Sequence, residues 1–409
     1  MAISLLLVIG LAVAVFVGFN IGGSSTGVAF GPAVGSHLVS KTGAAALFAL
    51  FALIGGWTSG REVVATMGGD IVPSSQFTLA ASVGVLFFVG LALLISNLFG
   101  VPASTSMTAV GAIAGLGLAS GTLNWATMGE IVSWWLVAPV LAFWVCAVIG
   151  RYFYPYLEAW FAIDRSGSAP ITLDRSGLVP TPRLANGATL TEGFWSVIVL
   201  AISCYMAFSA GASNTANAVA PLVGGGSLTT SQGVLLAAAA IAVGAFTIAR
   251  RTLDTIGNDL TDLPLLASLI VATVSATIIS VLSELGIPAS LAVSATMCIV
   301  GLGWGRATRT TTIADAASAA IQGEESATLS TGALAAETPG QTSDVDTADG
   351  PTADERVRPI GDEEPTELTS QELFDPSATG RVVMLWILTP SMSAIASFLL
   401  FQVFPVYGG

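Results

Sequence analysis

Two stretches of the sequence are rich in glycine, serine and threonine, residues that let a backbone approach a ligand closely and donate hydrogen bonds to it. Gly22–Gly35 reads GGSSTGVAFGPAVG, and Gly211–Gly224 reads GASNTANAVAPLVG. Backbone N–H groups at the start of a helix bind anions, and serine and threonine hydroxyls add further donors. The chemistry that these stretches favour is therefore the binding of an anion by neutral donors.

A second group of hydroxyls, Ser104, Thr105 and Ser106, begins two residues after Pro102. Proline is favoured in the first turn of a helix, so we expect these hydroxyls at a helix N-terminus, where they suit a tetrahedral oxyanion. Hydroxyls also bond to the carbonyls of their own helix, and that alternative stays open. The candidate anion-binding residues are Ser24, Ser25, Thr26, Ser104, Thr105, Ser106, Ser213, Asn214, Thr215, Asn217, Ser294 and Thr296.

The glycine-rich stretches must be positioned by the apolar runs that precede them. One helix through Ala2–Ser36 would be about 50 Å long, whereas the core of a bilayer is about 30 Å thick. We therefore expect both stretches to break or re-enter, which at membrane depth requires that the backbone line a cavity or be buried in protein. The alternative is close helix packing through small residues, although duplication at matched positions favours a site.

The duplication is the strongest pattern in the chain. The two glycine-rich stretches align with each other at an offset of 189 residues, and the same offset aligns Arg61 with Arg250. The pattern from Trp135 to Pro139 recurs from Trp386 to Pro390. Each copy contains five apolar spans, and because five is odd, the second copy enters the membrane from the opposite side. The sequence thus predicts an inverted repeat, the architecture of many secondary transporters.

The second group of hydroxyls repeats in one of two registers. Pro102–Gly111 matches Ala292–Gly301, which pairs Ser104 with Ser294. A rival register, shifted by four residues, pairs Ser104 with Ser290 instead. Four residues are about one helical turn, so the pairing of individual hydroxyls stays open.

The composition excludes a soluble protein. Mean hydropathy is +0.80 and only 10% of the 409 residues are charged, against roughly 25% in soluble domains. We predict an all-α integral membrane protein with about ten transmembrane helices, arranged as two inverted five-helix repeats with broken or re-entrant segments. The predicted spans are Ala2–Asn20, Thr42–Thr58, Phe77–Asn97, Ala103–Leu118, Ile131–Ile149, Phe194–Ala212, Gly233–Ala249, Leu263–Leu282, Leu285–Trp304 and Val382–Phe404.

The net charge of −13 is concentrated in one segment. More than half of the 26 acidic residues lie between Glu324 and Asp375, among threonine, serine, alanine, proline and glycine. Such a segment cannot bury enough apolar surface to fold, so we expect a disordered loop. The predicted organisation is a first repeat (1–150), a cytoplasmic linker (151–193), a second repeat (194–310), the acidic cytoplasmic loop (311–380) and the last helix (381–409).

Basic residues predict the orientation in the cell membrane. When the loops are assigned to alternating sides of the membrane at each predicted span, every lysine and arginine except Arg61 falls on the same side. Cytoplasmic loops carry the excess of basic residues, so the crowded side is predicted to be cytoplasmic and both termini extracellular.

The sequence offers no catalytic or metal-binding pattern. The three cysteines lie inside apolar spans without metal-like spacing, and the one histidine, His37, lies at a span end. No HExxH motif and no pair of catalytic acids occurs within the spans. We therefore expect no enzyme, no metal site and no cofactor beyond a coupling ion such as Na⁺, and no nucleic-acid partner.

These motifs resemble those of the PiT family of inorganic phosphate transporters. That family carries duplicated GANDxANAxGxxVG and PxSTTHxxVG signatures and a tryptophan-to-proline pattern in the last span of each half. GASNTANAVAPLVG and PASTSMTAVG are close matches, and the likeness covers both halves. The resemblance implies a secondary transporter for inorganic phosphate, coupled to Na⁺, embedded in lipid and compatible with a homo-oligomer. Alternatives are a permease for sulfate or another oxyanion, and a channel-like or non-transporting protein.

The sequence departs from the family pattern at its charged positions. Ser24-Ser25 and Ser213-Asn214 stand where the family has Asn-Asp, and Met107 stands where it has histidine. An intramembrane carboxylate is the usual handle for a proton or Na⁺, so its loss argues against proton coupling at this place. Na⁺ would then be bound by carbonyls, hydroxyls and Asn217, and Glu284 is a candidate replacement carboxylate.

The apolar spans contain no lysine or arginine. We therefore expect neutral donors to hold the anion, and expect Arg61 and Arg250 to draw anions to the two mouths of the pathway. The alternative for this arginine pair is a role as ordinary interfacial anchors.

Overall fold

The computed structural model describes residues 4–98, 104–161, 171–174, 181–184, 190–247, 264–310 and 376–408. Short helical turns occur at Thr66–Asp70, Ser74–Gln76, Ile149–Phe153 and Thr308–Thr310. The longer helices are α1 (Leu5–Gly35), α2 (Lys41–Trp57), α3 (Gly60–Ala65), α4 (Leu79–Leu98), α5 (Thr105–Ser120), α6 (Trp125–Val148), α7 (Tyr154–Trp160), α8 (Leu190–Gly224), α9 (Thr230–Thr247), α11 (Leu265–Glu284), α12 (Leu291–Ala307) and α14 (Pro376–Val403).

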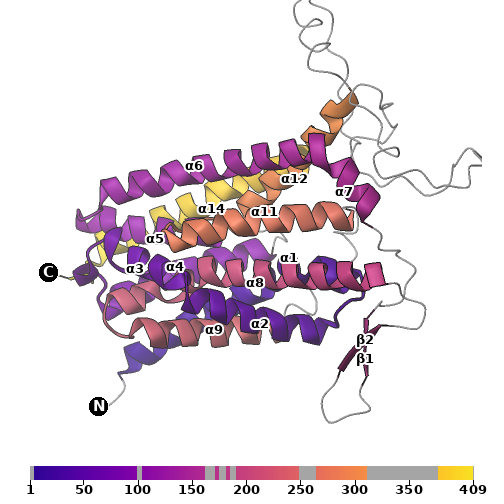
Figure 1. Cartoon of the computed structure of the whole chain (residues 1–409). Coiled ribbons are helices and arrows are strands. Elements are labelled where there is room, and N and C mark those ends of the chain that lie inside the picture. The colour runs from indigo at the N-terminus through magenta and orange to yellow at the C-terminus, as the bar shows by residue number, and fades with distance from the viewer. Residues whose placement is uncertain are drawn as a thin grey trace, which may run out of the picture.

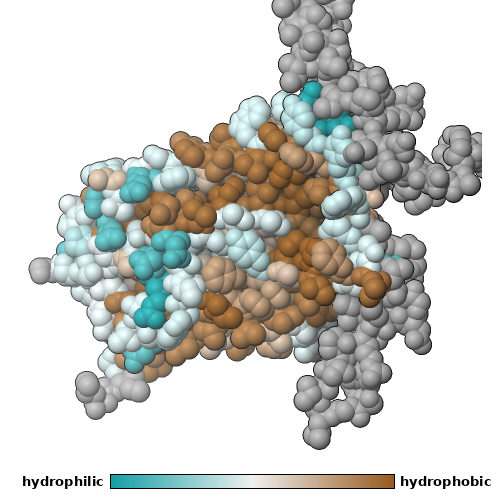
Figure 2. Space-filling model, viewed as in Figure 1, coloured by the Kyte–Doolittle hydropathy of each residue, from teal (hydrophilic) through white to brown (hydrophobic). Residues whose placement is uncertain are grey.

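The helices form one elongated bundle (Figure 1). In the described ranges, six helices are long and apolar enough to cross a membrane, and α2 with α3, bent by 63°, would make a seventh. Apolar side chains cover the middle of the bundle, between paler and more polar ends (Figure 2). On α6, for example, Leu136 is 69% exposed. Such a surface is stable only against lipid, so the expected helical, multi-pass membrane architecture is confirmed at this level.

One described element departs from the all-helical expectation. β1 (Ile171–Asp174) pairs with β2 (Thr181–Leu184) in an antiparallel hairpin, with Ile171 opposite Leu184. The hairpin and α7 lie in the segment that we expected to be a plain linker. Isoleucine and threonine have high strand propensity, which the span-based prediction did not weigh. The acidic segment Glu324–Asp375 lies outside the described residues.

The two glycine-rich stretches continue their helices without a break, so the prediction of broken or re-entrant backbone there is wrong. α1 runs through Gly22–Gly35 and α8 runs through Gly211–Gly224. The threonine hydroxyls of both stretches bond one turn back along their own helices: Thr26 donates to the Gly22 carbonyl at 2.7 Å, and Thr215 donates to the Gly211 carbonyl at 2.7 Å. The bend predicted at these stretches occurs instead between α2 and α3.

The glycines of these stretches bring helices into backbone contact. A Cβ on Gly22 would lie 1.9 Å from the carbonyl oxygen of Ile241 in α9, and one on Gly244 would lie 2.1 Å from that of Phe19 in α1. The α2–α8 contact repeats this pattern. There, Cβ atoms on Gly211 and Gly55 would lie 2.1 and 1.9 Å from the carbonyl oxygens of Ala52 and Phe208. The residues of the two contacts correspond one to one at the 189-residue offset, so small-residue packing is part of what the motif does.

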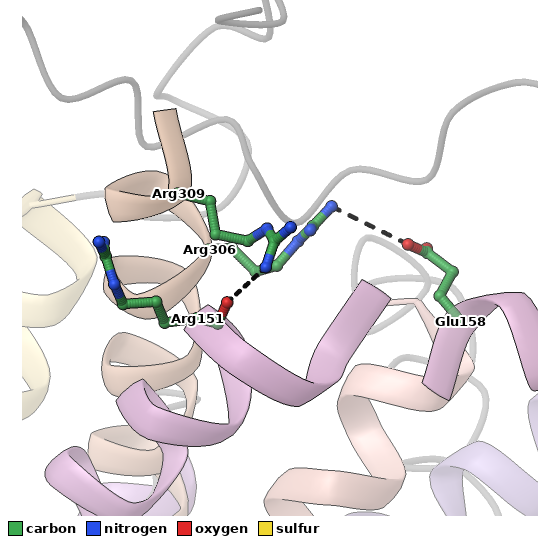
Figure 3. A network of polar contacts seen from close by, with 4 residues as sticks. All are labelled: Arg151, Glu158, Arg306 and Arg309. Carbon is green, nitrogen blue, oxygen red and sulfur yellow. Dashed lines mark hydrogen bonds and ion pairs between the residues drawn. The ribbon is translucent and has the colours of Figure 1, made fainter. Parts of the chain in front are cut away.

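Arginines join the ends of α6 and α12 (Figure 3). The Arg309 guanidinium, on a residue only 2% exposed, donates to the Arg151 carbonyl at 2.7 Å, and the Arg151 guanidinium donates in return to the Thr308 carbonyl. Arg306 forms a looser ion pair with Glu158 at 3.9 Å. The last carbonyls of a helix lack partners within the helix and carry partial negative charge. The arginines therefore cap both helices and fix them to each other.

The backbone contacts predict a strong effect of one methyl group. Gly211→Ala places its Cβ against the Ala52 carbonyl and must push α8 away from α2, and overpacking of this kind costs typically 1–3 kcal/mol. The melting temperature of the purified protein in detergent should fall clearly. Gly35→Ala is the control, because no atom lies within 4 Å of the position of its Cβ. Equal melting temperatures for the two variants would contradict the proposed role of Gly211.

Candidate anion-binding site

The buried polar centre of the bundle consists of Ser106 on α5 and of Ser213, Asn214 and Asn217 on α8. The Asn217 amide nitrogen donates to the Ser106 hydroxyl at 3.2 Å and to the Asn214 side-chain oxygen at 3.1 Å, with a longer contact of 3.4 Å to the Ser213 carbonyl. All four residues are buried, and Asn217 is 1% exposed. Because Asn217 is the donor to Ser106, the hydrogen of that hydroxyl can be directed to a ligand.

The start of α5 places Ser106 against α8. Ser104 is the N-cap, and its hydroxyl accepts a hydrogen bond from the Met107 backbone N–H at 3.3 Å. The first N–H groups of a helix have no partner within the helix and favour negative charge. The first turn of α5 therefore brings the Ser106 hydroxyl to the polar centre, close to the first N–H groups of the helix.

The start of α12 has the same construction. Ser290 is its N-cap and accepts from the Val293 backbone N–H at 3.3 Å. Ser290 is therefore the functional counterpart of Ser104, which agrees with the register that pairs these two serines rather than the one that pairs Ser104 with Ser294. Ser290 is absent from the predicted set, although the repeated Pro-Ala-Ser sequence before each helix signals it.

Several predicted residues serve their own helices instead of the polar centre. Ser24 donates to the Asn20 and Ile21 carbonyls at 3.2 Å, and Thr296 donates to the Ala292 carbonyl at 3.0 Å. Thr26 and Thr215 bond in the same way one turn back. Ser25 and Thr105 are partly exposed, and Ser294 is buried in the first turn of α12.

The polar centre contains no ionisable side chain, in keeping with the expectation of neutral donors. Glu284 is exposed at the end of α11, so it does not replace the missing carboxylates in the buried polar centre.

Arg61 donates to the Ser231 hydroxyl at 3.1 Å and lies over the Trp57 ring at 5.0 Å. These contacts are those of an interfacial anchor, and Arg250 lies outside the described residues. Within the described ranges, no three metal-ligating side chains come together.

A small apolar cluster joins the first turns of α5 and α12. Met107 of α5 and Val293 of α12 contact Trp386 of α14, and Trp135 of α6 packs against them. The Trp135 indole N–H donates to the Pro288 carbonyl at 2.8 Å and so fixes the connection that leads into α12. The repeated tryptophan-to-proline pattern signals both tryptophans in the sequence, but it does not indicate this position beside the polar centre.

A bundle of apolar helices around a buried centre of neutral polar groups is the arrangement of a membrane transport protein rather than of an enzyme. Comparison with known proteins agrees with this class. The sequence model described as the phosphate transporter family matches residues 21–397. The chain therefore belongs to the phosphate transporter family, as its motifs predicted.

Individual relatives carry two substrate names. The chain is 31% identical over 289 residues to the sulfate permease CysP of Bacillus subtilis (strain 168), which covers 70% of this chain and 74% of that protein. It is 26% identical over 372 residues to a Helicobacter pylori (strain ATCC 700392 / 26695) protein assigned as a phosphate permease, with 74% and 68% covered. Its fold is similar to a solved structure titled "The sodium-dependent phosphate transporter", with a TM-score of 0.65, 17% identity and 98% and 100% covered.

The polar centre predicts which side chains matter for affinity. Asn217→Ala and Ser213→Ala should each raise the KM for the transported anion. Losing a hydrogen bond to a charged group costs about 1.5–3 kcal/mol, roughly ten- to a hundredfold in affinity. Thr215→Val is the matched control on the same buried helix segment, because the Thr215 hydroxyl is held by a 2.7 Å bond to the Gly211 carbonyl, whereas the Ser213 hydroxyl has only a longer contact of 3.4 Å to the Ala210 carbonyl. Parent-like transport by both alanine variants would place the site elsewhere.

Proposed function

We propose that this protein is a secondary transporter for inorganic phosphate across the cell membrane. Membership of the phosphate transporter family supports the class. The observation that carries the proposal is the side-chain oxygen of Asn217, which is buried and has no hydrogen-bond partner among the described residues. A buried acceptor left unpaired costs about 1–3 kcal/mol, so its natural partner is a ligand.

The orientation of the Asn217 amide follows from its neighbours. The Asn214 side-chain oxygen and the Ser213 carbonyl can only accept hydrogen bonds, so the group that faces both of them must be the Asn217 nitrogen. The Asn217 oxygen therefore points away from these groups, on the same amide whose nitrogen reaches Ser106 of α5.

This acceptor distinguishes phosphate from sulfate. Inorganic phosphate retains at least one proton at neutral pH and must place a P–O–H group against an acceptor, whereas sulfate carries no proton. A binding site discriminates most strongly against a ligand that leaves one of the buried polar groups of the site without a hydrogen-bond partner. Sulfate would leave the Asn217 oxygen unpaired in this way. An oxygen at Asn217 beside the hydroxyl of Ser106 and the N–H groups of α5 therefore favours phosphate.

Na⁺ is the proposed coupling ion. The polar centre contains no carboxylate that could carry a proton, while amide and hydroxyl oxygens are ligands for hard cations. The Asn214 side-chain oxygen and the Ser213 carbonyl are the candidates, since each has a second lone pair beyond the hydrogen bond from Asn217. The likeness in fold to a protein titled as sodium-dependent supports this choice.

For the architecture, we propose two inverted repeats of five helices, with chain divisions at 1–150, 151–193, 194–310, 311–380 and 381–409. The support is the residue-by-residue correspondence of the α1–α9 and α8–α2 contacts and of the two serine caps. The start of α1 and the end of α14 lie at one end of the bundle, opposite α7 and the hairpin (Figure 1). Arg151, Arg306 and Arg309 lie beside α7 (Figure 3), which supports a cytoplasmic assignment of that end and extracellular termini.

A second candidate substrate is sulfate. The observation that favours it is the 31% identity to a sulfate permease, together with the absence of charged side chains from the polar centre. A site made only of donors would suit sulfate better than phosphate. The Asn217 oxygen is the group that decides between the two readings.

Transport by the full chain in proteoliposomes tests the proposal. We expect saturable uptake of radiolabelled phosphate that requires Na⁺ and shows counterflow, with sulfate as a weaker competitor. Sulfate uptake that excess phosphate does not inhibit would assign the second candidate. Uptake without saturation or counterflow would identify a channel and contradict a carrier mechanism.

Two variants separate the roles within the polar centre. Ser106→Ala removes a donor that either anion can use, so it should weaken phosphate and sulfate by similar factors. Asn217→Ala also removes the acceptor that only phosphate needs, so it should weaken phosphate about tenfold more than sulfate. Competition curves for the two anions against each variant measure the ratio. An unchanged ratio in Asn217→Ala would refute the acceptor role.

A further inference from the structure

One face of α14 carries a buried row of polar side chains, Trp386, Thr389, Ser393 and Ser397. Their spacing of three or four residues places them on one side of the helix, while Ile387 on the other side is 66% exposed. The Ser397 hydroxyl donates to the Ala112 carbonyl of α5 at 2.7 Å. The row therefore faces α5, which carries Ser106 of the polar centre.

The indole N–H of Trp386 is buried and has no hydrogen-bond partner among the described residues. Trp386 is 8% exposed, and a tryptophan N–H can only donate. Buried tryptophans usually find an acceptor for this group, and inside a membrane no water from the bilayer can supply one. An unpaired donor at this depth therefore indicates a missing acceptor.

Trp386 lies at the level of the polar centre. It contacts Met107, the residue after Ser106, and Val293 in the first turn of α12. Further along α5 and α14, a Cβ on Gly111 would lie 2.5 Å from the Pro390 carbonyl oxygen, and a Cβ on Gly115 would lie 2.3 Å from the Ala394 carbonyl oxygen. α5 and α14 therefore run parallel and in register, and Trp386 packs beside the first turn of α5.

The counterpart of Trp386 in the sequence repeat already has a protein acceptor. Trp135 donates its indole N–H to the Pro288 carbonyl at 2.8 Å. The two tryptophans contact the same apolar cluster, yet only the N–H of Trp135 has a partner in the described part of the chain. The residue that corresponds to Pro288 in the repeat is Pro102, which lies outside the described residues, so within the described chain the Trp386 N–H has no acceptor like the one that Trp135 has.

We propose that Trp386 contacts the substrate, with its indole N–H donating to an oxygen of the transported tetrahedral oxyanion. This inference rests on the proposed function and adds a residue from α14 to a site otherwise made by α5 and α8. A hydrogen bond from a neutral N–H to an anion is charge-assisted and strong, and it adds no fixed positive charge that would hinder release. Since the N–H only donates, it binds an unprotonated oxygen, which both phosphate and sulfate possess.

Trp386→Phe tests the contact because it keeps an aromatic ring and removes the N–H. Binding of phosphate and of sulfate to the purified full chain, measured by calorimetry, should weaken about ten- to a hundredfold for both anions, with an unchanged melting temperature. Trp144→Phe, on the exposed side of α6, is the matched control and should bind like the parent. Trp135→Phe loses the bond to Pro288 and should lower the melting temperature instead.

A second measurement covers the case in which Trp386→Phe is destabilised. In the parent protein labelled with ¹⁵N-indole, saturating phosphate should shift the N–H resonance of Trp386 downfield and leave that of Trp144 in place. Parent-like affinity of Trp386→Phe, or no shift of its resonance, would overturn the proposal. If Asn217→Ala still weakens binding in that case, the proposed function stands and only the role of Trp386 fails. If neither variant changes binding, the site itself is misplaced.

Discussion

Gly22 and Gly244 bring α1 and α9 together until backbone meets backbone, and Gly211 and Gly55 do the same for α8 and α2. No larger side chain fits at these four positions without separating the helices. Helices in lipid associate through such close packing, since lipid offers no hydrophobic driving force between them. The position of Asn217, six residues along α8 from Gly211, follows from this contact. The geometry of the polar centre therefore depends on these glycines, which lack side chains and let the helices pack closely.

The polar centre shows how a transporter can bind an anion without a fixed cation. Its groups are amides, hydroxyls and the N–H ends of helices, each of which contributes a modest free energy on its own. A buried arginine would bind a divalent anion more tightly, but a tightly bound substrate leaves slowly and transport requires release. Two buried or partly buried arginines bind helix ends instead: Arg151 caps α12 and Arg309 caps α6. Neutral side chains are thus proposed to bind the anion, while charged side chains hold the helices together.

Composition and duplication were enough to predict a helical membrane protein, because both depend on patterns that extend over many residues, and the resemblance of the duplicated motifs indicated the family. The prediction also named Asn217 and Ser106, which the fold brings together from opposite halves of the chain. It was wrong about broken backbone in α1 and α8, since Thr26 and Thr215 satisfy carbonyls within the helix and the glycines meet a neighbouring helix instead of a ligand. It left out Ser290, although the repeated Pro-Ala-Ser sequence signals this N-cap. It also left out Trp386, whose proposed role follows from an N–H group that lacks a partner after folding, a property of three-dimensional packing that no local pattern records.

The helix pairs have a consequence for synthesis. α1 packs on α9, α2 on α8, α5 on α14 and α6 on α12, so each pair joins an early helix to a late one. The ribosome delivers α1, α2, α5 and α6 to the membrane before any of these partners exists. The faces of the early helices that meet these partners must then wait in lipid or against transient neighbours, and α5 cannot reach its final packing until α14 is inserted. The nascent chain is therefore most vulnerable to misassembly and proteolysis late in translation, and the protein folds as one unit rather than half by half.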